Sequence, residues 1–164
     1  IVGRFVLEYI PFMRSRRFCL SCLVLTSLIA AGPAEEVLAG QRISGPVEAS
    51  AIRVIDGDTV LVDATPWPNQ HVTTYVRLRG IDAPELKSRC PETRDAAERA
   101  HSALEELVAS SATLSLSNIS GDKYFGRVVA SLELEEGRDA SSILLDEGLV
   151  DPYQGGRKKT ASCP

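Results

Sequence analysis

The order in which strand-like and helix-like segments follow one another restricts the fold of this chain more than any other feature. Residues 51–56, 59–62 and 71–81 have the residue types and alternation of β-strands. A turn at Asp56-Gly57-Asp58 separates the first two segments, and a loop at residues 64–70, which contains two prolines, precedes the third. These short returns predict an antiparallel meander of three strands.

A long helix, two more strands and a shorter helix are predicted next. The helix covers residues 90–110, because Cys90-Pro91 suits a helix start and apolar residues then recur at the spacing of one buried stripe. Strands are predicted at residues 113–116 and 127–134. A second helix is predicted over residues 139–147, with an aspartate at its N-cap and a glycine after its end.

Three strands, a helix, two strands and a helix in about 100 residues suit one small domain. A five-stranded barrel with its helix between the third and fourth strands has the OB-fold order. We therefore predict a mainly β (α+β) protein, a five-stranded OB-fold barrel with two helices. An α+β sandwich is the alternative, because periodicity alone does not determine whether a sheet closes.

The N-terminal segment has the layout of a signal peptide. The only methionine, Met13, is followed by arginines and then by an apolar run at residues 18–31. That run of about 14 residues is too short to span a bilayer. Val37-Leu38-Ala39 resembles a cleavage site, so residues 13–39 are predicted to be removed as the signal peptide. Residues 1–12 are then upstream sequence or a misplaced start, and a genuine longer leader is the alternative.

The predicted export sets the expected organisation of the remaining chain. It consists of a polar linker at residues 40–50, a globular domain at 51–156 and a C-terminal tail at 157–164. Ser15-Arg16-Arg17 gives a partial twin-arginine signal, but the strongly apolar run favours general secretion. We expect a protein of the periplasm or the extracellular space, with no stable membrane association after cleavage.

The cysteines fit an exported protein. Cys19 and Cys22 lie inside the leader, which leaves Cys90 and Cys163 in the mature chain. An even number of cysteines in an oxidising compartment predicts that these two pair. The bond would close a loop of about 70 residues and, on the chain-entropy model, stabilise the fold by a few kcal/mol. Two free thiols are the alternative.

The charge of the mature chain excludes a general polycation. From Gly40 onward there are 4 Lys and 10 Arg against 19 Asp and Glu, a formal charge of −5. Proteins that coat duplex nucleic acid usually present a basic face. Any polyanion must therefore be held by a few well-placed arginines.

Charged residues gather where the third predicted strand ends. Val76 and Leu78 share its apolar face, Arg77 and Arg79 share the other, and Gly80-Ile81-Asp82-Ala83-Pro84-Glu85 follows directly. Two carboxylates three residues apart, with a proline between them, can converge on one side of the chain. Taken singly, each residue also fits an ordinary turn or a solvated strand face.

Three motifs, in order, resemble those of the staphylococcal nuclease family. They are Val54-Ile55-Asp56-Gly57-Asp58-Thr59-Val60, then Val76-Arg77-Leu78-Arg79-Gly80-Ile81-Asp82-Ala83-Pro84-Glu85, then Asp122-Lys123-Tyr124-Phe125-Gly126-Arg127. The later Leu144-Leu145-Asp146-Glu147-Gly148-Leu149 resembles the second helix of that family. The resemblance implies an OB-fold monomer that performs calcium-dependent, endonucleolytic and sugar-nonspecific hydrolysis of DNA and RNA, with single-stranded or unpaired regions preferred.

The resemblance also implies a calcium site. Asp58 and Asp82 would bind the ion through their carboxylates, together with the main-chain carbonyl of Ala83. Relatives often have threonine at this last position, but a main-chain ligand tolerates alanine. A hard cation takes such oxygen ligands.

The catalytic roles are carried over in the same way. Glu85 would be the general base, or the carboxylate that orients the attacking water. Arg77 and Arg127 would grip the phosphate and stabilise the charge that builds up in the transition state. Lysine should not replace either, because a guanidinium binds two phosphate oxygens at once.

The aromatic residues are where the chain departs from the family pattern. Tyr124, Phe125 and Tyr153 are candidates for contacts with bases or sugars, since aromatic faces stack on any base. Relatives often read Asp-Lys-Tyr-Gly-Arg, whereas here Phe125 stands before Gly126. For each ring, simple packing is the alternative. We expect the third helix found in many relatives to be absent here, or replaced by the tail that carries Cys163.

The competing function is a non-catalytic OB-fold module that binds nucleic acid or oligosaccharide. Such a module predicts decay of the catalytic motif, yet all five charged residues are present: Asp58, Arg77, Asp82, Glu85 and Arg127. This favours the nuclease. A purely structural protein held by a disulfide gives no account of the paired arginines.

Overall fold

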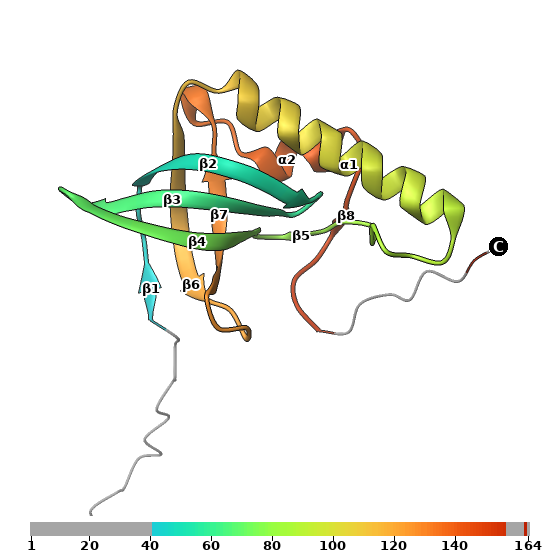
Figure 1. Ribbon diagram of the computed structural model, residues 1–164, viewed down its shortest axis with the longest axis horizontal. Helices are drawn as coiled ribbons and strands as arrows, with labels where there is room; N and C mark the ends of the chain where they lie inside the picture. Colours follow the sequence, from blue (N-terminus) through green and yellow to red (C-terminus); the bar gives the residue numbers. More distant parts are fainter. Residues whose placement is uncertain (1–40, 157–162, 164) are drawn as a thin grey trace, which may run out of the picture. The chain divides into compact units, whose positions relative to one another are not determined.

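Five strands close into a barrel (Figure 1). They are β2 (Val47–Asp56), β3 (Thr59–Trp67), β4 (Gln70–Leu78), β6 (Leu114–Gly121) and β7 (Arg127–Glu133). Their order is β6-β2-β3-β4-β7, and β7 pairs back with β6. The β4–β7 pair is parallel and the other pairs are antiparallel. The predicted OB-fold barrel is therefore confirmed, and its closure excludes the sandwich.

The computed structural model describes residues 41–156 and Cys163. They all belong to one of the two units of the chain, Leu38–Pro164. The predicted signal peptide and the tail residues 157–162 and 164 lie outside the described residues, so the leader and its cleavage site stay predictions. Within the described part, no helix is both long and apolar enough to cross a membrane.

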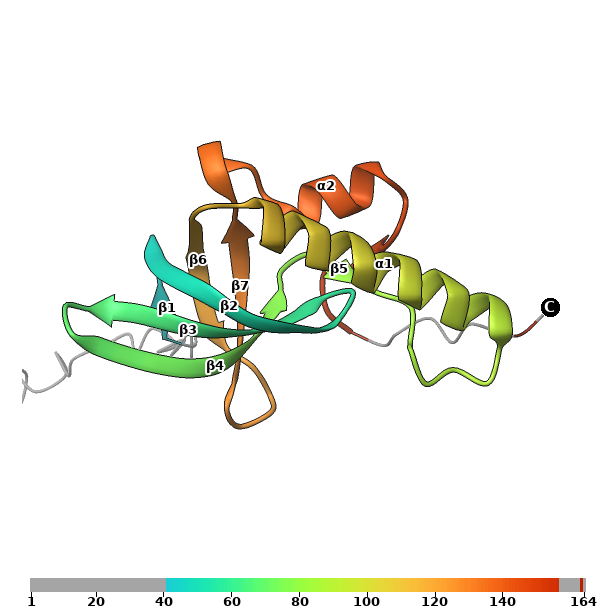
Figure 2. The same ribbon diagram turned by 45° about the horizontal axis from the view of Figure 1, so that its top comes forward.

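Helices and short strands complete the described fold. They are α1 (Pro91–Ser110), α2 (Ala140–Asp146), β1 (Arg42–Ile43), β5 (Ile81–Asp82), β8 (Asp151–Pro152) and a short 3-10 helix at Glu135–Gly137. Figures 1 and 2 show α1 and α2 next to each other on the same side of the barrel. β1 extends the sheet beyond β6, and β5 and β8 form a separate two-stranded sheet.

Both predicted helices form where the sequence places them. α1 follows its N-cap Cys90 and covers the barrel with a buried stripe of Ala97, Ala100 and Leu104. α2 begins after Asp139, whose Oδ1 accepts the backbone N–H of Ser142 at 2.8 Å. That side chain satisfies one of the donors left over at the start of a helix.

Two strands are longer than the sequence predicts. β2 begins at Val47, four residues before the predicted start, because Val47 pairs with Leu116 of β6. β3 continues through Pro66 to Trp67, where the sequence predicts a loop. The pairing of β3 with β4 shifts between Ala64 and Trp67, so the missing N–H of Pro66 falls where this ladder is interrupted and the proline is tolerated.

β6 is also longer, since it runs to Gly121 rather than ending at Leu116. Its register against β7 shifts between Ser117 and Ser120, which is the signature of a β-bulge. Asn118 lies in this bulge with φ 51°. The extra residue interrupts the alternation on which strand prediction depends.

The third predicted strand is divided into two. β4 ends at Leu78, and Gly80 turns the chain with φ 86°, a conformation that favours glycine. β5 then begins at Ile81. After this turn, β5 carries Asp82, whose Oδ1 accepts a hydrogen bond from Arg77 of β4.

Alternate residues of β4 face opposite sides, as predicted. Val76 and Leu78 are fully buried in the barrel, at 0% and 1% exposure. Arg77 and Arg79 lie on the other face and are only partly buried. The barrel core and the candidate site therefore share one strand.

A disulfide joins Cys90 and Cys163. Their Cα atoms are 5.6 Å apart, within the range that disulfides span. Because Cys90 is the N-cap of α1, this bond ties the end of the chain to the start of the long helix.

Candidate active site

A cleft of ≈ 1010 Å³ opens beside the end of β4. Its walls come from the β4–β5 turn, the loop between β6 and β7, and the segment after β8. The charged and aromatic residues that line it are Asp56, Arg77, Arg79, Glu85, Asp122, Lys123, Tyr124, Arg127 and Tyr153. Residues from all three sequence motifs therefore face one cavity.

Arg77 bridges two of the predicted carboxylates. Its Nη1 donates to Oδ1 of Asp58 and its Nη2 to Oδ1 of Asp82, both at 2.6 Å. Nη2 also donates to the carbonyl of Ile81 at 3.4 Å. Burial alone would lower the pKa of Arg77, but the two carboxylates outweigh burial and raise it. One guanidinium thus holds two distant carboxylates beside each other.

Asp58 is the most buried member of this group, at 2% exposure. Its Oδ2 accepts the N–H of Ala83 at 2.9 Å, and its Oδ1 accepts the hydroxyl of Thr59 at 2.8 Å. Burial raises the pKa of Asp58, although the Ala83 N–H and the charge of Arg77 act in the opposite direction. The local bonds therefore do not fully offset the cost of burying this charge.

Gly57 allows Asp58 to reach this position. A Cβ at residue 57 would lie 2.6 Å from the Cβ of Ala100 and 2.9 Å from the Cβ of Ala83. Both distances are shorter than side-chain carbons tolerate. Glycine therefore lets the β2–β3 turn pack against α1 and against the backbone that hydrogen-bonds Asp58.

The C-terminal segment holds Asp82 in place. Asp82 pairs with Asp151 where β5 meets β8, and the N–H of Tyr153 donates to the carbonyl of Gly80 at 2.8 Å. The strand that carries Asp82 is thus fixed by a segment from the far end of the chain. The same segment brings Tyr153 into the cleft.

Glu85 lines the same cleft, three residues beyond Asp82. Its backbone carbonyl accepts the N–H of Ser88 at 3.0 Å, which closes a turn after Pro84. Glu85 is exposed, whereas the carboxylates that bond Arg77 are buried or partly buried. This position suits a base that exchanges protons with water.

Arg127 is the first residue of β7 and pairs with Tyr75 of β4. Its Nε donates to Oδ2 of Asp122 at 2.5 Å. The centre of its guanidinium lies 4.6 Å from the centroid of the Tyr124 ring, a cation–π contact. Asp122 and Tyr124 together fix the side chain at the edge of the cleft.

The three predicted aromatic contacts lie in different settings. Tyr124 is 56% exposed and Phe125 is fully exposed, at 108%, but only Tyr124 lines the cleft. Tyr153 lines the cleft from the segment after β8, with its ring centroid 5.9 Å from the Arg77 guanidinium. Its hydroxyl donates to the carbonyl of Gly156 at 2.8 Å. Phe125 therefore stands apart from the other two rings.

Four charged residues of the cleft have no role predicted from the sequence: Asp56, Arg79, Asp122 and Lys123. Asp56 lines the cleft, accepts the N–H of Asp58 at 3.1 Å, and adds a third carboxylate charge. Asp122 pairs with Arg127, and Arg79 extends the arginine stripe of β4. Asp56 and Asp122 fall inside the quoted motifs, but a turn aspartate has the same sequence signature whether or not it faces a cleft.

The oxygen donors around Asp58 are of the chemical types that suit a partly hydrated divalent cation. In the residues described by the structure, no group of three or more His, Cys, Asp or Glu side chains is arranged to hold a metal ion. Arg77 nevertheless holds Asp58 and Asp82 together, and the backbone of Ala83 adjoins Asp58. Carboxylate and carbonyl oxygens suit calcium or magnesium, which keep water in their remaining positions.

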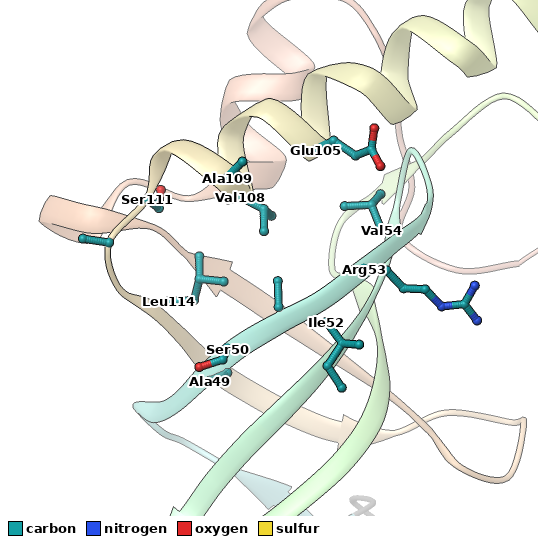
Figure 3. Close-up of a pocket in the computed structure, with 12 residues that line it drawn as sticks. Ala49, Ser50, Ile52, Arg53, Val54, Glu105, Val108, Ala109, Ser111 and Leu114 are labelled. Atoms are coloured by element: carbon teal, nitrogen blue, oxygen red, sulfur yellow. The ribbon is translucent and has the colours of Figure 1, made fainter.

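A second groove lies between β2 and the C-terminal half of α1 (Figure 3). It is lined largely by apolar side chains such as Ile52, Val108 and Leu114, with Arg53 and Glu105 at its polar margin. None of the predicted site residues lines it. The cleft beside β4 is therefore the candidate active site.

The barrel and this cleft define an OB-fold domain that presents arginines and carboxylates together, the residue types that bind phosphates and divalent cations. A family model described as staphylococcal nuclease homologue matches residues 75–162, which is more than half of the chain. This chain belongs to the staphylococcal nuclease homologue family. The match includes Arg77, Asp82, Glu85 and Arg127, while Asp58 lies before it. A comparison with curated proteins finds no match.

Proposed function

We propose that this chain is an exported, calcium-dependent endonuclease that hydrolyses phosphodiester bonds in both DNA and RNA, with single-stranded or unpaired regions preferred. The observation that supports this most strongly is that Arg77, which lines the cleft together with Glu85 and Arg127, bridges the carboxylates of Asp58 and Asp82 behind it. Membership of the nuclease homologue family agrees with it.

Calcium is the proposed cofactor, with Asp58, Asp82 and the carbonyl of Ala83 as its protein ligands. A bound divalent ion supplies Lewis-acid stabilisation of a phosphoryl oxygen and makes a nearby water a better nucleophile. The chain itself contributes two carboxylates already held together by one guanidinium. It also contributes the buried carboxylate of Asp58, whose pKa is raised by burial despite the charge of Arg77, so that a bound cation would further stabilise its charged form.

Glu85 is the proposed general base. It is exposed in the cleft, so its carboxylate can take a proton from a water molecule that attacks the phosphorus and then pass it to solvent. Pro84 restricts the backbone between it and Asp82. This keeps the base close to the carboxylates that bond Arg77.

The two arginines are proposed to stabilise the phosphate as charge builds up on it. Arg127 is already fixed by Asp122 and Tyr124, so little side-chain order is lost when it binds an anion. The bonds of Arg77 to Asp58, Asp82 and the carbonyl of Ile81 use three of the five N–H donors of a guanidinium, so the others can donate to a phosphate oxygen. Arg77 therefore links the carboxylates and the substrate.

We further propose different roles for the two rings of the β6–β7 loop. Tyr124 contacts Arg127 at 4.6 Å and Lys123 at 5.0 Å, so it orients cationic groups beside the phosphate. Phe125 is fully exposed and offers its ring as a stacking platform for an unpaired base. Tyr153 is proposed to contact the sugar or base from the segment after β8.

The test uses the chain from Gly40, which contains every described strand and helix. Single-stranded DNA and RNA are incubated with it in calcium or in chelator, next to Glu85→Ala. We expect both polymers to be cut in calcium only, and the variant to lose most of this activity. Glu98→Gln, on the exposed face of α1, is the control and should cut normally.

Two outcomes contradict the proposal. Equal cutting by the wild type and Glu85→Ala rules out the assigned base. Binding of the polymers without cutting, in calcium, establishes a non-catalytic binding module instead.

Export is proposed on the leader sequence alone. Expression of the full chain in a bacterial host, followed by N-terminal sequencing of the exported product, should give Gly40 as the first residue. Recovery of the uncleaved chain in the cytoplasm only would contradict export.

A further inference from the structure

A row of paired residues crosses the outer surface of the sheet from Arg77 to Arg42. Arg77 of β4 is opposite Val129 of β7, Val129 is opposite Ser120 of β6, and Ser120 is opposite Arg42 of β1. Residues opposite each other in neighbouring strands point to the same face of a sheet. The row begins at the candidate site and extends for three strand spacings, about 14 Å.

Arg79 lies beside this row and contacts its middle. Its Nη2 donates to the carbonyl of Asn118 at 2.6 Å, the hydroxyl of Ser120 at 2.7 Å and the carbonyl of Val129 at 2.9 Å. The bulge at Asn118 turns that carbonyl toward the guanidinium. Neutral oxygens therefore hold Arg79 and leave its charge uncompensated.

The other two arginines of the cleft differ in this respect. Arg77 is paired with two carboxylates and Arg127 with Asp122. Across residues 41–156, neither Arg79 nor Arg42 forms an ion pair with a carboxylate. The Nε of Arg79 is buried and has no acceptor among the described atoms.

Arg79 and Arg42 also act on each other. Burial lowers the pKa of Arg79, and the charge of Arg42 lowers it further. Two guanidinium groups close enough to repel one another, neither of them in an ion pair within residues 41–156, form a local excess of positive charge. An anion placed between them would relieve this repulsion and give Nε an acceptor.

We infer that Arg79, Ser120 and Arg42 form a second phosphate-binding site, which holds a neighbouring phosphate of the same nucleic-acid strand that is cut beside Arg77. This inference rests on the proposed function and extends it. The strand runs from the cleft across β7 and β6 toward β1. The preferred substrate is therefore a chain of several nucleotides rather than a dinucleotide.

A purely structural role for Arg79 is the competing explanation, because its contacts join β4 to the bulge of β6. Replacement of Arg42 distinguishes the two explanations. Arg42 is exposed, and no side-chain hydrogen bond to it is present within the described residues. Its replacement should leave the fold intact while it removes one charge from the second site.

The experiment measures binding of a fluorescent single-stranded DNA octamer, in calcium and at several salt concentrations. Glu85→Gln is the common background, so that the DNA is not cut. Arg42→Gln and Arg79→Gln are each compared with Arg53→Gln, an exposed arginine of β2 outside the cleft. Thermal unfolding is recorded for every variant.

We expect Arg42→Gln and Arg79→Gln each to weaken octamer binding about three- to tenfold. Each should reduce the slope of log K against log salt by about 0.7, the value for one phosphate contact on a single strand. The loss should be smaller for a dinucleotide, and Arg53→Gln should behave as the background does.

Octamer binding by Arg42→Gln equal to that by Arg53→Gln would overturn the second site, even if wild-type cutting is normal. An effect of Arg79→Gln that comes with a lower unfolding temperature, while Arg42→Gln has none, would assign Arg79 to the fold alone. Failure of the wild type to cut in calcium would instead overturn the proposed nuclease function, and the binding comparison would still report on the second site.

Discussion

At the scale of single residues, Arg77 links the fold and the chemistry. It is the one described residue that hydrogen-bonds both Asp58 and Asp82. A planar guanidinium does this with two separate nitrogens in a fixed fork, and an ammonium has no equivalent geometry. The identity of this residue therefore matters beyond its charge.

Replacement of Arg77 by lysine tests that point. Arg77→Lys keeps the charge but should cut single-stranded DNA at least about 100-fold more slowly, since it loses the bidentate donor at the phosphate. Initial rates in saturating calcium give the comparison, with Arg53→Lys as the exposed control. A rate within threefold of wild type would contradict the role of the guanidinium fork.

Gly57 gives a prediction about stability. Gly57→Ala places a methyl group 2.6 Å from the Ala100 Cβ and 2.9 Å from the Ala83 Cβ. We expect a loss of roughly 1–3 kcal/mol in the free energy of unfolding by urea, because neither neighbour is flexible. Gly121→Ala is the matched control, since nothing lies within 4 Å of its Cβ, and it should change the stability little. Equal stability of the two variants would contradict the close packing of the β2–β3 turn.

At the scale of elements, the β6–β7 loop places two neighbouring aromatic residues in different surroundings. The Tyr124 ring lies against Arg127, whereas Phe125 does not line the cleft and is fully exposed. A fully exposed phenylalanine gains nothing from the fold. Its ring is available to a ligand without prior rearrangement.

The different positions of the two rings predict that their replacement changes different kinetic constants. Phe125→Ala should raise KM for single-stranded substrates several-fold with little change in kcat, because a lost stacking contact costs about 1–3 kcal/mol of binding. Tyr124→Ala should mainly lower kcat, because Arg127 loses a neighbour that orients it. Steady-state kinetics on one oligonucleotide measures both. Identical changes in KM and kcat for the two variants would count against separate roles.

The helices and strands also show which features of the fold the sequence predicts correctly. Alternation at Val76 to Arg79 predicts correctly which face of β4 is buried. The predicted ends of β3 and β6 are wrong near Pro66 and Asn118. Each of these residues lies where the pairing between strands shifts register, so the strand continues through it. The motifs predict which charged residues belong to the candidate site. The pairing of Asp122 with Arg127 depends on the conformation of the β6–β7 loop, which the spacing of residues does not encode.

At the scale of the whole molecule, the C-terminal segment is joined to the middle of the chain at two places. β8, from the C-terminal segment, pairs with β5 and holds Asp82, and Cys163 is bonded to Cys90 at the start of α1. These long-range links connect residues far apart in the sequence. Their loss should therefore affect stability strongly.

The disulfide gives a prediction at this scale. Cys90→Ser with Cys163→Ser should lower the free energy of unfolding by about 4 kcal/mol on the chain-entropy model for a loop of this length. Urea unfolding of the chain from Gly40, which has only these two cysteines, measures the change, and a reductant should produce the same loss in the wild type. Unchanged stability under both treatments, or an intact mass two hydrogens heavier than the bonded form, would contradict the pairing.

The central claim is that this cleft cuts nucleic acid and that Glu85 takes part in the chemistry. The most direct measurement records binding and cutting of one single-stranded DNA by the wild type and Glu85→Gln in calcium. The account predicts that the variant binds with a Kd within about threefold of wild type but cuts at least about 100-fold more slowly. Cutting by Glu85→Gln at the wild-type rate would contradict it.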